Sequence, residues 1–213
     1  MLTVHHLGVS QSERIVWLCE ELGIPYELKR YDRDRETRAA PAEYKALHPL
    51  GAAPVITDGK VVMAESGAIV DYIIARHGQG RLAVKPDASN YPDYIYWFHY
   101  VNGTLQPSGS LNMILGRAGL PGDGPFLQAM QARFARALQA VEVRLGAAEF
   151  LAGNELTAAD IMMVFTLTTM RYFNPYSLAR YPNILAYLQR IGDRPAYRRA
   201  MEKGDPGMAL LLT

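Results

Sequence analysis

The pair Asp58-Gly59 constrains the fold more than any other feature of this sequence. It separates two runs rich in β-branched residues, Val55-Ile56-Thr57 and Val61-Val62-Met63. An Asp-Gly pair between such runs predicts a tight β-hairpin. From Ser66 onward the apolar residues follow helical spacing. The chain therefore has to form an antiparallel strand pair that leads directly into a helix.

The residues before this hairpin predict alternating strands and helices. Leu2-Thr3-Val4 is typical of a strand, and residues 13–22 place their apolar side chains on one helical face. A second strand begins at Pro25, and a short helix is expected over residues 42–47. Together with the hairpin and the helix after it, this order predicts a small mixed α/β unit over residues 1–80.

The pattern changes after a linker at residues 81–90. Residues 91–213 show helical spacing throughout, so we expect an all-helical second domain. Within it, Thr157 and Asp160 have the spacing of a capping box in front of an apolar helix. We interpret Asp160 as a structural residue that caps this helix.

Charge and cysteine content exclude several functions. The 22 Lys and Arg residues nearly balance 21 Asp and Glu residues, which favours neither nucleic acid nor an anionic membrane as a partner. The single cysteine, Cys19, excludes an internal disulfide and any Cys-x-x-Cys site. The first residues lack the basic start and long apolar run that are typical of a signal peptide, and no apolar run approaches the ~18 residues of a membrane helix. We expect a soluble, cytoplasmic protein without a metal site, since no carboxylate can be assigned to His5 and His6.

Glu65 and Ser66 lie between the second hairpin strand and the helix that follows. They have two interpretations. Both residues are suited to capping, because a serine oxygen accepts an orphan helix N–H and an acid is favourable near the positive helix end. Alternatively, a helix N-terminus binds a ligand carboxylate, and Glu65 beside it favours a ligand that also carries an ammonium group. An α-amino acid carries both charges on one carbon.

Four stretches together resemble a known family. They read VSQSERIVWLCEELGIPYE from Val9, HPLGAAPVI from His48, AESGAIVDYI from Ala64 and LTAADI from Leu156. In their order and spacing, the chain is similar to a cytosolic glutathione transferase over nearly its whole length. The resemblance implies an α/β domain followed by an all-α domain: a thioredoxin-like unit with a mixed four-stranded sheet, then a helical unit.

The resemblance also assigns roles to the residues around the hairpin. Ser66 and its backbone N–H are implied to hold the α-carboxylate of the γ-glutamyl end of glutathione, and Glu65 its ammonium group. Ala53 is implied to pair its backbone with the cysteinyl unit, and Pro54 corresponds to the cis-proline of the family. For the glycyl carboxylate the family often uses Lys or Gln where this chain has Ala52. Lys45 is our candidate here, with Arg38 and His48 as alternatives.

The thiolate of glutathione needs a stabilising group, and the resemblance is to the serine-type classes. Ser10 matches the serine position best, so we expect it to be catalytic. Ser12 competes for the role, although it is also suited to cap the helix from Glu13. Cys19 is expected to be a buried small hydrophobe. Lowering a thiol pKa from ~8.5 to ~6.5 needs about 2.7 kcal/mol. A charged hydrogen bond of roughly 1.5–3 kcal/mol, with a helix N-terminus, supplies that without a general base or metal.

The implied function is conjugation of glutathione, as co-substrate, to a small apolar electrophile. The electrophile pocket is expected between the domains, with His99, Asn102 and Tyr172 as candidates, and a homodimer is implied. Within the same chemistry, the alternative is a glutathione-dependent peroxidase or disulfide reductase. The alternative of another class is a non-catalytic ligand-binding or interaction module. The joint presence of Ser10, Ala53-Pro54 and Glu65-Ser66 favours the enzyme.

Overall fold

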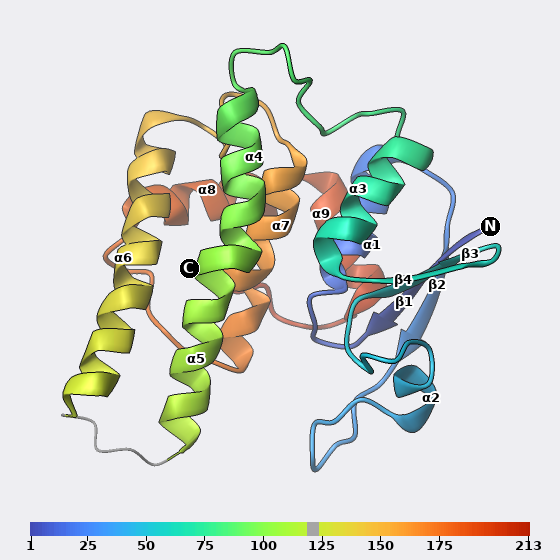
Figure 1. Ribbon diagram of the computed structural model, residues 1–213, viewed down its shortest axis with the longest axis horizontal. Helices are drawn as coiled ribbons and strands as arrows, with labels where there is room; N and C mark the ends of the chain where they lie inside the picture. Colours follow the sequence, from blue (N-terminus) through green and yellow to red (C-terminus); the bar gives the residue numbers. More distant parts are fainter. Residues whose placement is uncertain (119–123) are drawn as a thin grey trace. The chain divides into compact units, whose positions relative to one another are not determined.

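Residues 1–118 and 124–213 are described by this computed structural model of the protein (Figure 1). The chain divides into two compact units. The first comprises residues 1–83 and 191–210, and the second comprises residues 84–190 and 211–213. The predicted boundaries at 80 and 90 stay a prediction. Here the last helix groups with the first unit.

The first unit is built on one mixed sheet of four strands. The strands are β1 Leu2–Leu7, β2 Glu27–Tyr31, β3 Val55–Asp58 and β4 Val61–Ala64. Their order is β2-β1-β3-β4, with β1 parallel to β2 and antiparallel to β3. The pairs Asp58 with Val61 and Val55 with Ala64 close the antiparallel hairpin. The predicted mixed four-stranded sheet and its hairpin are therefore confirmed.

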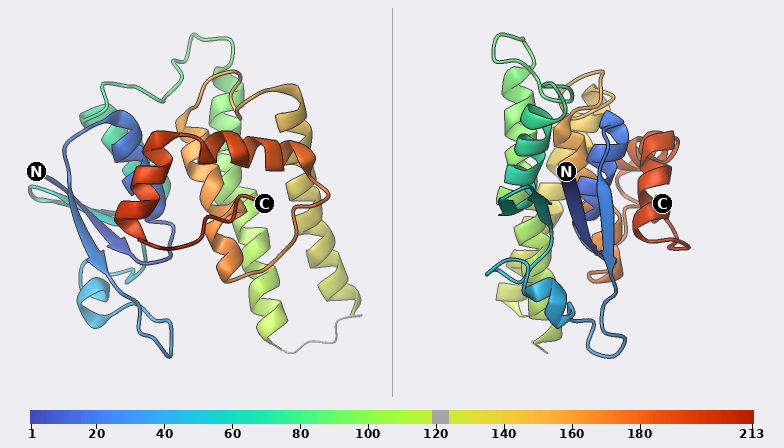
Figure 2. Two further views of the ribbon diagram at one scale, coloured as in Figure 1. Left: turned by 180° about the vertical axis from the view of Figure 1, so that it is seen from behind. Right: turned by 90° about the vertical axis from the view of Figure 1, so that its right-hand side faces the viewer.

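Four helices accompany the sheet. They are α1 Glu13–Leu22, α2 Ala42–Lys45, α3 Ser66–Arg76 and α9 Pro195–Gly204. Helix α1 packs against both α3 and α9, and α9 lies beside α1 in both views of Figure 2. At that contact the rings of Trp17 and Tyr197 meet edge to face with centroids 5.0 Å apart, and both side chains are buried. Helix α9 therefore completes the core of the first unit.

The regular elements of the second unit are all helical over its described residues, as predicted. Its elements are α4 Tyr91–Tyr100, a π-helical segment Val101–Leu105, α5 Gln106–Arg117, α6 Pro125–Ala147, α7 Ala158–Leu167, a 3₁₀ turn Thr169–Tyr172 and α8 Pro182–Gly192. The predicted capping box of α7 is present, and the Thr157 N–H donates to the Asp160 carboxylate at 2.8 Å. Asp160 also accepts hydrogen bonds from the Leu151 N–H and the Tyr187 hydroxyl. Its role here is structural, because it joins three segments of this unit.

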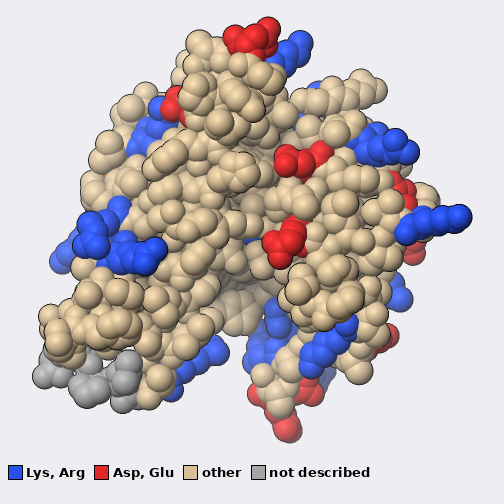
Figure 3. All heavy atoms as spheres, in the orientation of Figure 1, with Lys and Arg blue, Asp and Glu red and all other residues tan. Residues whose placement is uncertain are grey.

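The surface carries both signs of charge. On the face shown in Figure 3, basic and acidic side chains are scattered, several of them next to one another, with uncharged areas between the groups. Among the described residues, no helix has both the length and the apolar character that crossing a membrane requires.

Candidate functional site

Ser10 lies in the loop between β1 and α1, with its side chain turned inward. Its Oγ donates to the Leu7 carbonyl oxygen at 2.7 Å and lies 2.7 Å from Ser12 Oγ. The Ser12 backbone N–H donates to Ser10 Oγ at 3.2 Å. Ser10 is only 5 % exposed. Only a small part of Ser10 therefore faces solvent, and its hydrogen bonds are made to groups in the interior of the first unit.

The residue before Ser10 holds an unfavourable backbone conformation. Val9 has φ = +49°, a region that β-branched residues rarely occupy. Its N–H donates to Asp205 Oδ1 at 2.9 Å, and Arg33 Nε donates to the Gly8 carbonyl at 2.8 Å. The loop is thus held by one acidic and one basic side chain. Strain that neighbouring groups maintain in this way is typical of functional loops.

Ser12 occupies the N-cap position of α1, but its side chain makes no capping hydrogen bond to that helix. The prediction that the Ser12 side chain caps α1 is therefore wrong. Its Oγ instead accepts the Leu7 N–H at 3.1 Å and lies 2.9 Å from His6 Nδ1. Because three polar groups around it compete for this hydroxyl, Ser12 faces the interior of the unit and not the helix end.

His6 joins Ser12 to Asp205 at the end of α9. His6 Nε2 lies 3.1 Å from Asp205 Oδ2, and His6 is fully buried. The sequence offered no carboxylate for His6, because its partner lies 199 positions away. No local pattern signals this pair; only the packing of α9 against α1 brings the two residues together.

Ala53 and Pro54 precede β3, and the peptide bond between them is cis. The Gln11 amide Nε2 donates to the Ala53 carbonyl at 3.1 Å. The other end of the Gln11 amide, Oε1, accepts from Arg14 Nη1 at 2.8 Å. Gln11 thereby connects the loop before α1 with the backbone segment before β3. The sequence analysis missed Gln11, since nothing in its local pattern distinguishes it from a surface glutamine.

Glu65 and Ser66 begin α3 in an unusual geometry. Glu65 has φ = +69° and is exposed, while Ser66 is buried as the first helical residue. The Glu65 side chain, at the N-cap position, makes no cap hydrogen bond to this helix. Arg14 Nη1 donates to Ser66 Oγ at 3.3 Å. A capping hydrogen bond from its side chain therefore does not account for Glu65 at this position.

Arg14 is the second site residue that the sequence analysis missed. Its guanidinium is fully buried, and burial lowers the pKa of Arg14 to about 9, opposed by the charge of Glu13. Because this value lies above neutral pH, the group stays cationic. A buried cation beside Ser66 and the N-terminus of α3 makes this position attractive to an anion.

The candidates for the glycyl end lie on the neighbouring loops. Lys45 is exposed at the end of α2, and its Cγ approaches the turn at Gly51. His48 Nδ1 accepts the Leu50 N–H at 3.2 Å, and the Arg38 carbonyl accepts from Arg33 Nη1 at 2.9 Å. Lys45 therefore retains a side chain in solvent that can reach toward a ligand.

Cys19 offers no alternative nucleophile. Cys19 is fully buried in α1, and burial, with the nearby charge of Glu20, raises the pKa of its thiol. It is thus held as an unreactive thiol. Within residues 1–118 and 124–213, no group of three or more His, Cys, Asp or Glu side chains is arranged to hold a metal ion.

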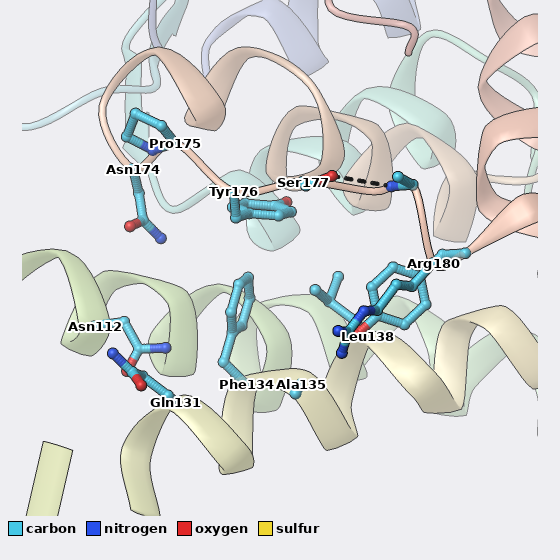
Figure 4. A pocket seen from close by; sticks show the side chains of 12 residues that line it. Asn112, Gln131, Phe134, Ala135, Leu138, Asn174, Pro175, Tyr176, Ser177 and Arg180 are labelled. Carbon is cyan, nitrogen blue, oxygen red and sulfur yellow. Dashed lines mark hydrogen bonds between the residues drawn. The ribbon is translucent and has the colours of Figure 1, made fainter. Parts of the chain in front are cut away.

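In the helical unit, His99, Asn102 and Tyr172 are all exposed. Asn102 lies in the π-helical segment between α4 and α5. A separate cavity of about 530 Å³ lies between α6 and the segment 174–181. In Figure 4, Phe134 points toward Tyr176, and the two rings meet edge to face with their centroids 5.0 Å apart. The three predicted residues do not line that cavity.

Comparison with known proteins matches both halves of the chain. Residues 10–76 match the model of the glutathione S-transferase N-terminal domain, and residues 124–190 match that of the C-terminal domain. The chain is 31% identical to glutathione S-transferase 3 of Schizosaccharomyces pombe, over 100% of this chain and 92% of the relative.

Solved structures of glutathione transferases share the fold of this chain. A crystal structure of a glutathione S-transferase from Actinobacillus pleuropneumoniae is 37% identical, with a TM-score of 0.88 over 96% of this chain and 93% of that one. A glutathione transferase family member from Pseudomonas fluorescens, solved with two glutathione bound, shares the fold at 22% identity, with a TM-score of 0.78 over 94% and 92% of the two chains.

Proposed function

Because this chain belongs to the glutathione S-transferase family, we propose that it binds glutathione beside the loop before α1 and transfers it to an apolar electrophile. One observation carries the proposal at the level of residues. Gln11 and Arg14 link three separate segments through hydrogen bonds to each other, to the Ala53 carbonyl and to Ser66 Oγ. A single extended peptide ligand would contact these same segments.

The γ-glutamyl end is assigned to the start of α3. Ser66 and the N–H groups of the first turn receive its α-carboxylate, and the buried charge of Arg14 adds to the attraction. Glu65 receives the ammonium group. Its positive φ supports this role, because a non-glycine residue in that region is retained against a backbone cost.

The cysteinyl unit is assigned to the backbone of Ala53. In the structure the Gln11 amide donates to the Ala53 carbonyl oxygen. In the proposed complex Gln11 rotates away, and the ligand N–H takes its place at this oxygen. One hydrogen bond is exchanged for another, and the net cost is small.

Ser10 is assigned to the thiolate. It needs to supply about 2.7 kcal/mol to lower the thiol pKa by ~2 units, and a hydrogen bond to a charged acceptor contributes roughly 1.5–3 kcal/mol. The N-terminus of α1 adds ~0.3–1 kcal/mol. Lys45 is assigned to the glycyl carboxylate, supported by its exposed side chain near Gly51.

We assign the contacts with the electrophile to His99, Asn102 and Tyr172. The π-helical segment around Asn102 supports the assignment, since such insertions in α-helices occur frequently at functional sites. We also infer a homodimer in a cytoplasmic compartment. The compartment is supported by the single cysteine, which has no disulfide partner in the sequence.

Calorimetric titration with glutathione, followed by conjugation kinetics with an apolar aryl halide, tests the proposal. Ser10→Ala is expected to lower the conjugation rate about 10- to 150-fold with little change in glutathione affinity. Asn102→Ala is expected to raise the KM for the electrophile alone. Saturable binding without conjugation or peroxide reduction would instead identify a ligand-binding module, and no binding would refute the proposal.

A further inference from the structure

A line of four buried polar side chains leads from Ser10 into the first unit. Ser10 Oγ lies 2.7 Å from Ser12 Oγ, Ser12 Oγ 2.9 Å from His6 Nδ1, and His6 Nε2 3.1 Å from Asp205 Oδ2. These residues come from β1, the following loop and the end of α9. The function proposed above uses only the first of them.

Hydrogen-bond chemistry fixes the direction of this line, beginning at Asp205. Burial alone would raise the pKa of Asp205, but the hydrogen bonds from His6 and from the Val9 N–H hold it below its ordinary value. Asp205 is therefore a carboxylate that only accepts. Its Oδ1 takes the Val9 N–H, so its Oδ2 takes the proton on His6 Nε2. A neutral His6 then presents an unprotonated Nδ1.

The two serines follow from that tautomer. The Ser12 hydroxyl donates to His6 Nδ1, and Ser12 Oγ accepts the Leu7 N–H at 3.1 Å. Its second lone pair faces Ser10 Oγ at 2.7 Å, and the Ser10 hydroxyl, which donates to the Leu7 carbonyl oxygen at the same distance, turns to Ser12 when the relay operates. Ser10 Oγ accepts the Ser12 N–H and keeps one lone pair for an incoming donor. The Ser12 hydroxyl thus donates to His6 and His6 donates to Asp205, while the Ser10 hydroxyl donates inward to the Leu7 carbonyl and has Ser12 Oγ at the same distance.

The packing around His6 is built to admit this arrangement. A Cβ at Gly204 would lie 3.1 Å from His6 Nε2, and a Cβ at Gly8 would lie 3.3 Å from Asp205 Oδ1. Both positions are glycines, and neither has a positive φ. Their lack of a side chain therefore serves the close approach to His6 and Asp205.

We propose that His6 accepts the thiol proton of glutathione through Ser10 and Ser12, with Asp205 and Ser12 as the positioning residues. The inference rests on the proposed function. The S–H bond breaks as its proton passes to Ser10 Oγ, the Ser10 proton to Ser12 Oγ, and the Ser12 proton to His6 Nδ1. The products are a thiolate, two intact serines and an imidazolium paired with Asp205. Net charge is unchanged.

The transfer also reverses the hydrogen bonds. The imidazolium donates from Nδ1 to Ser12, Ser12 donates to Ser10, and the Ser10 hydroxyl turns to the sulfur. The same line that removes the proton thereby leaves Ser10 as the donor that stabilises the thiolate. Ser10 alone touches the substrate in this scheme, and His6 acts through the two serines.

Counting protons tests the relay. Glutathione is titrated into the full-length protein by calorimetry in two buffers of equal pH and different ionisation enthalpy, which gives the protons released per site. The ultraviolet absorbance of the thiolate gives the thiolates formed per site. For the wild type we expect the released protons to fall short of the thiolates by up to about one per site, since His6 retains them.

Two variants interrupt the relay differently. Ser12→Ala removes a link, while His6→Asn keeps an acceptor near Ser12 but takes no proton. In both, released protons should equal the thiolates formed. His77→Gln is the matched control, because His77 also pairs with an aspartate, Asp58, in the same unit, and it should keep the wild-type shortfall. A wild type without a shortfall, or variants that retain it, would overturn the relay. A wild type that forms no thiolate would overturn the proposed function itself.

Discussion

Glu65 offers a substitution in which stability and binding are expected to move in opposite directions. Its φ of +69° is sterically unfavourable for a residue with a side chain. Such a conformation costs about 1–3 kcal/mol, and Glu65→Gly removes that cost. The added freedom of glycine in the unfolded chain returns about 0.4–1 kcal/mol. The variant should therefore be more stable by up to about 2.6 kcal/mol, which corresponds to a midpoint up to about 10 °C higher.

Binding should weaken in the same variant. Glu65→Gly deletes the carboxylate that we assign to the ammonium group of glutathione. The loss of a charged hydrogen bond costs roughly 1.5–3 kcal/mol, which corresponds to a dissociation constant about 10- to 150-fold higher. Thermal unfolding without ligand measures the first quantity, and calorimetric titration with glutathione measures the second.

Glu65→Gln is the matched control, because it keeps the side chain and the backbone strain but removes the charge. Its unfolding midpoint should equal that of the wild type while its affinity falls. A Glu65→Gly variant that binds glutathione as tightly as the wild type would refute the assignment. A lower midpoint for Glu65→Gly would refute the argument from strain.

Three further outcomes are expected. Cys19→Ala should leave conjugation unchanged and cost about 1–2 kcal/mol of stability from lost burial, measured by kinetics and urea unfolding. The hydrogen bond from His77 lowers the pKa of Asp58. The stability that this interaction gives the folded protein is therefore full above the pKa of Asp58 in the unfolded chain, and it is lost as the pH falls through the lower pKa of Asp58 in the folded protein. In His77→Gln, the free energy of unfolding should fall less steeply as the pH is lowered than it does in the wild type, as denaturant unfolding at several pH values would show. Asp160→Ala should cost at least about 3 kcal/mol, because it leaves several buried donors unsatisfied at ~1–3 kcal/mol each, as denaturant unfolding would show.

The sequence predicted those parts of the fold that local chemistry determines. The limits of α1 match the expected 13–22, because Gly23 adopts φ = +61° and its N–H caps the last carbonyls. The Asp58-Gly59 turn fixed the hairpin register, and the capping box fixed the start of α7. In each case the residues that decide the structure lie within a few positions of one another.

Contacts between distant segments could not be predicted in the same way. Asp205 meets His6 only because α9 packs against α1, and that contact depends on the shape of buried side chains such as Trp17 and Tyr197. Ser12 has the sequence context of a helix cap, yet its hydroxyl joins His6 because the interior offers it stronger partners. The roles of Gln11 and Arg14 likewise depend on hydrogen-bond partners that lie 42 and 52 positions away in the sequence.

The central claim is that this transferase lowers the thiol pKa of bound glutathione through Ser10. The most direct test follows the thiolate absorbance of glutathione bound to the wild type and to Ser10→Ala as a function of pH. We predict a thiol pKa about two units below that of free glutathione in the wild type, and a value close to that of free glutathione in Ser10→Ala. Equal pKa values for bound and free glutathione in the wild type would contradict the account.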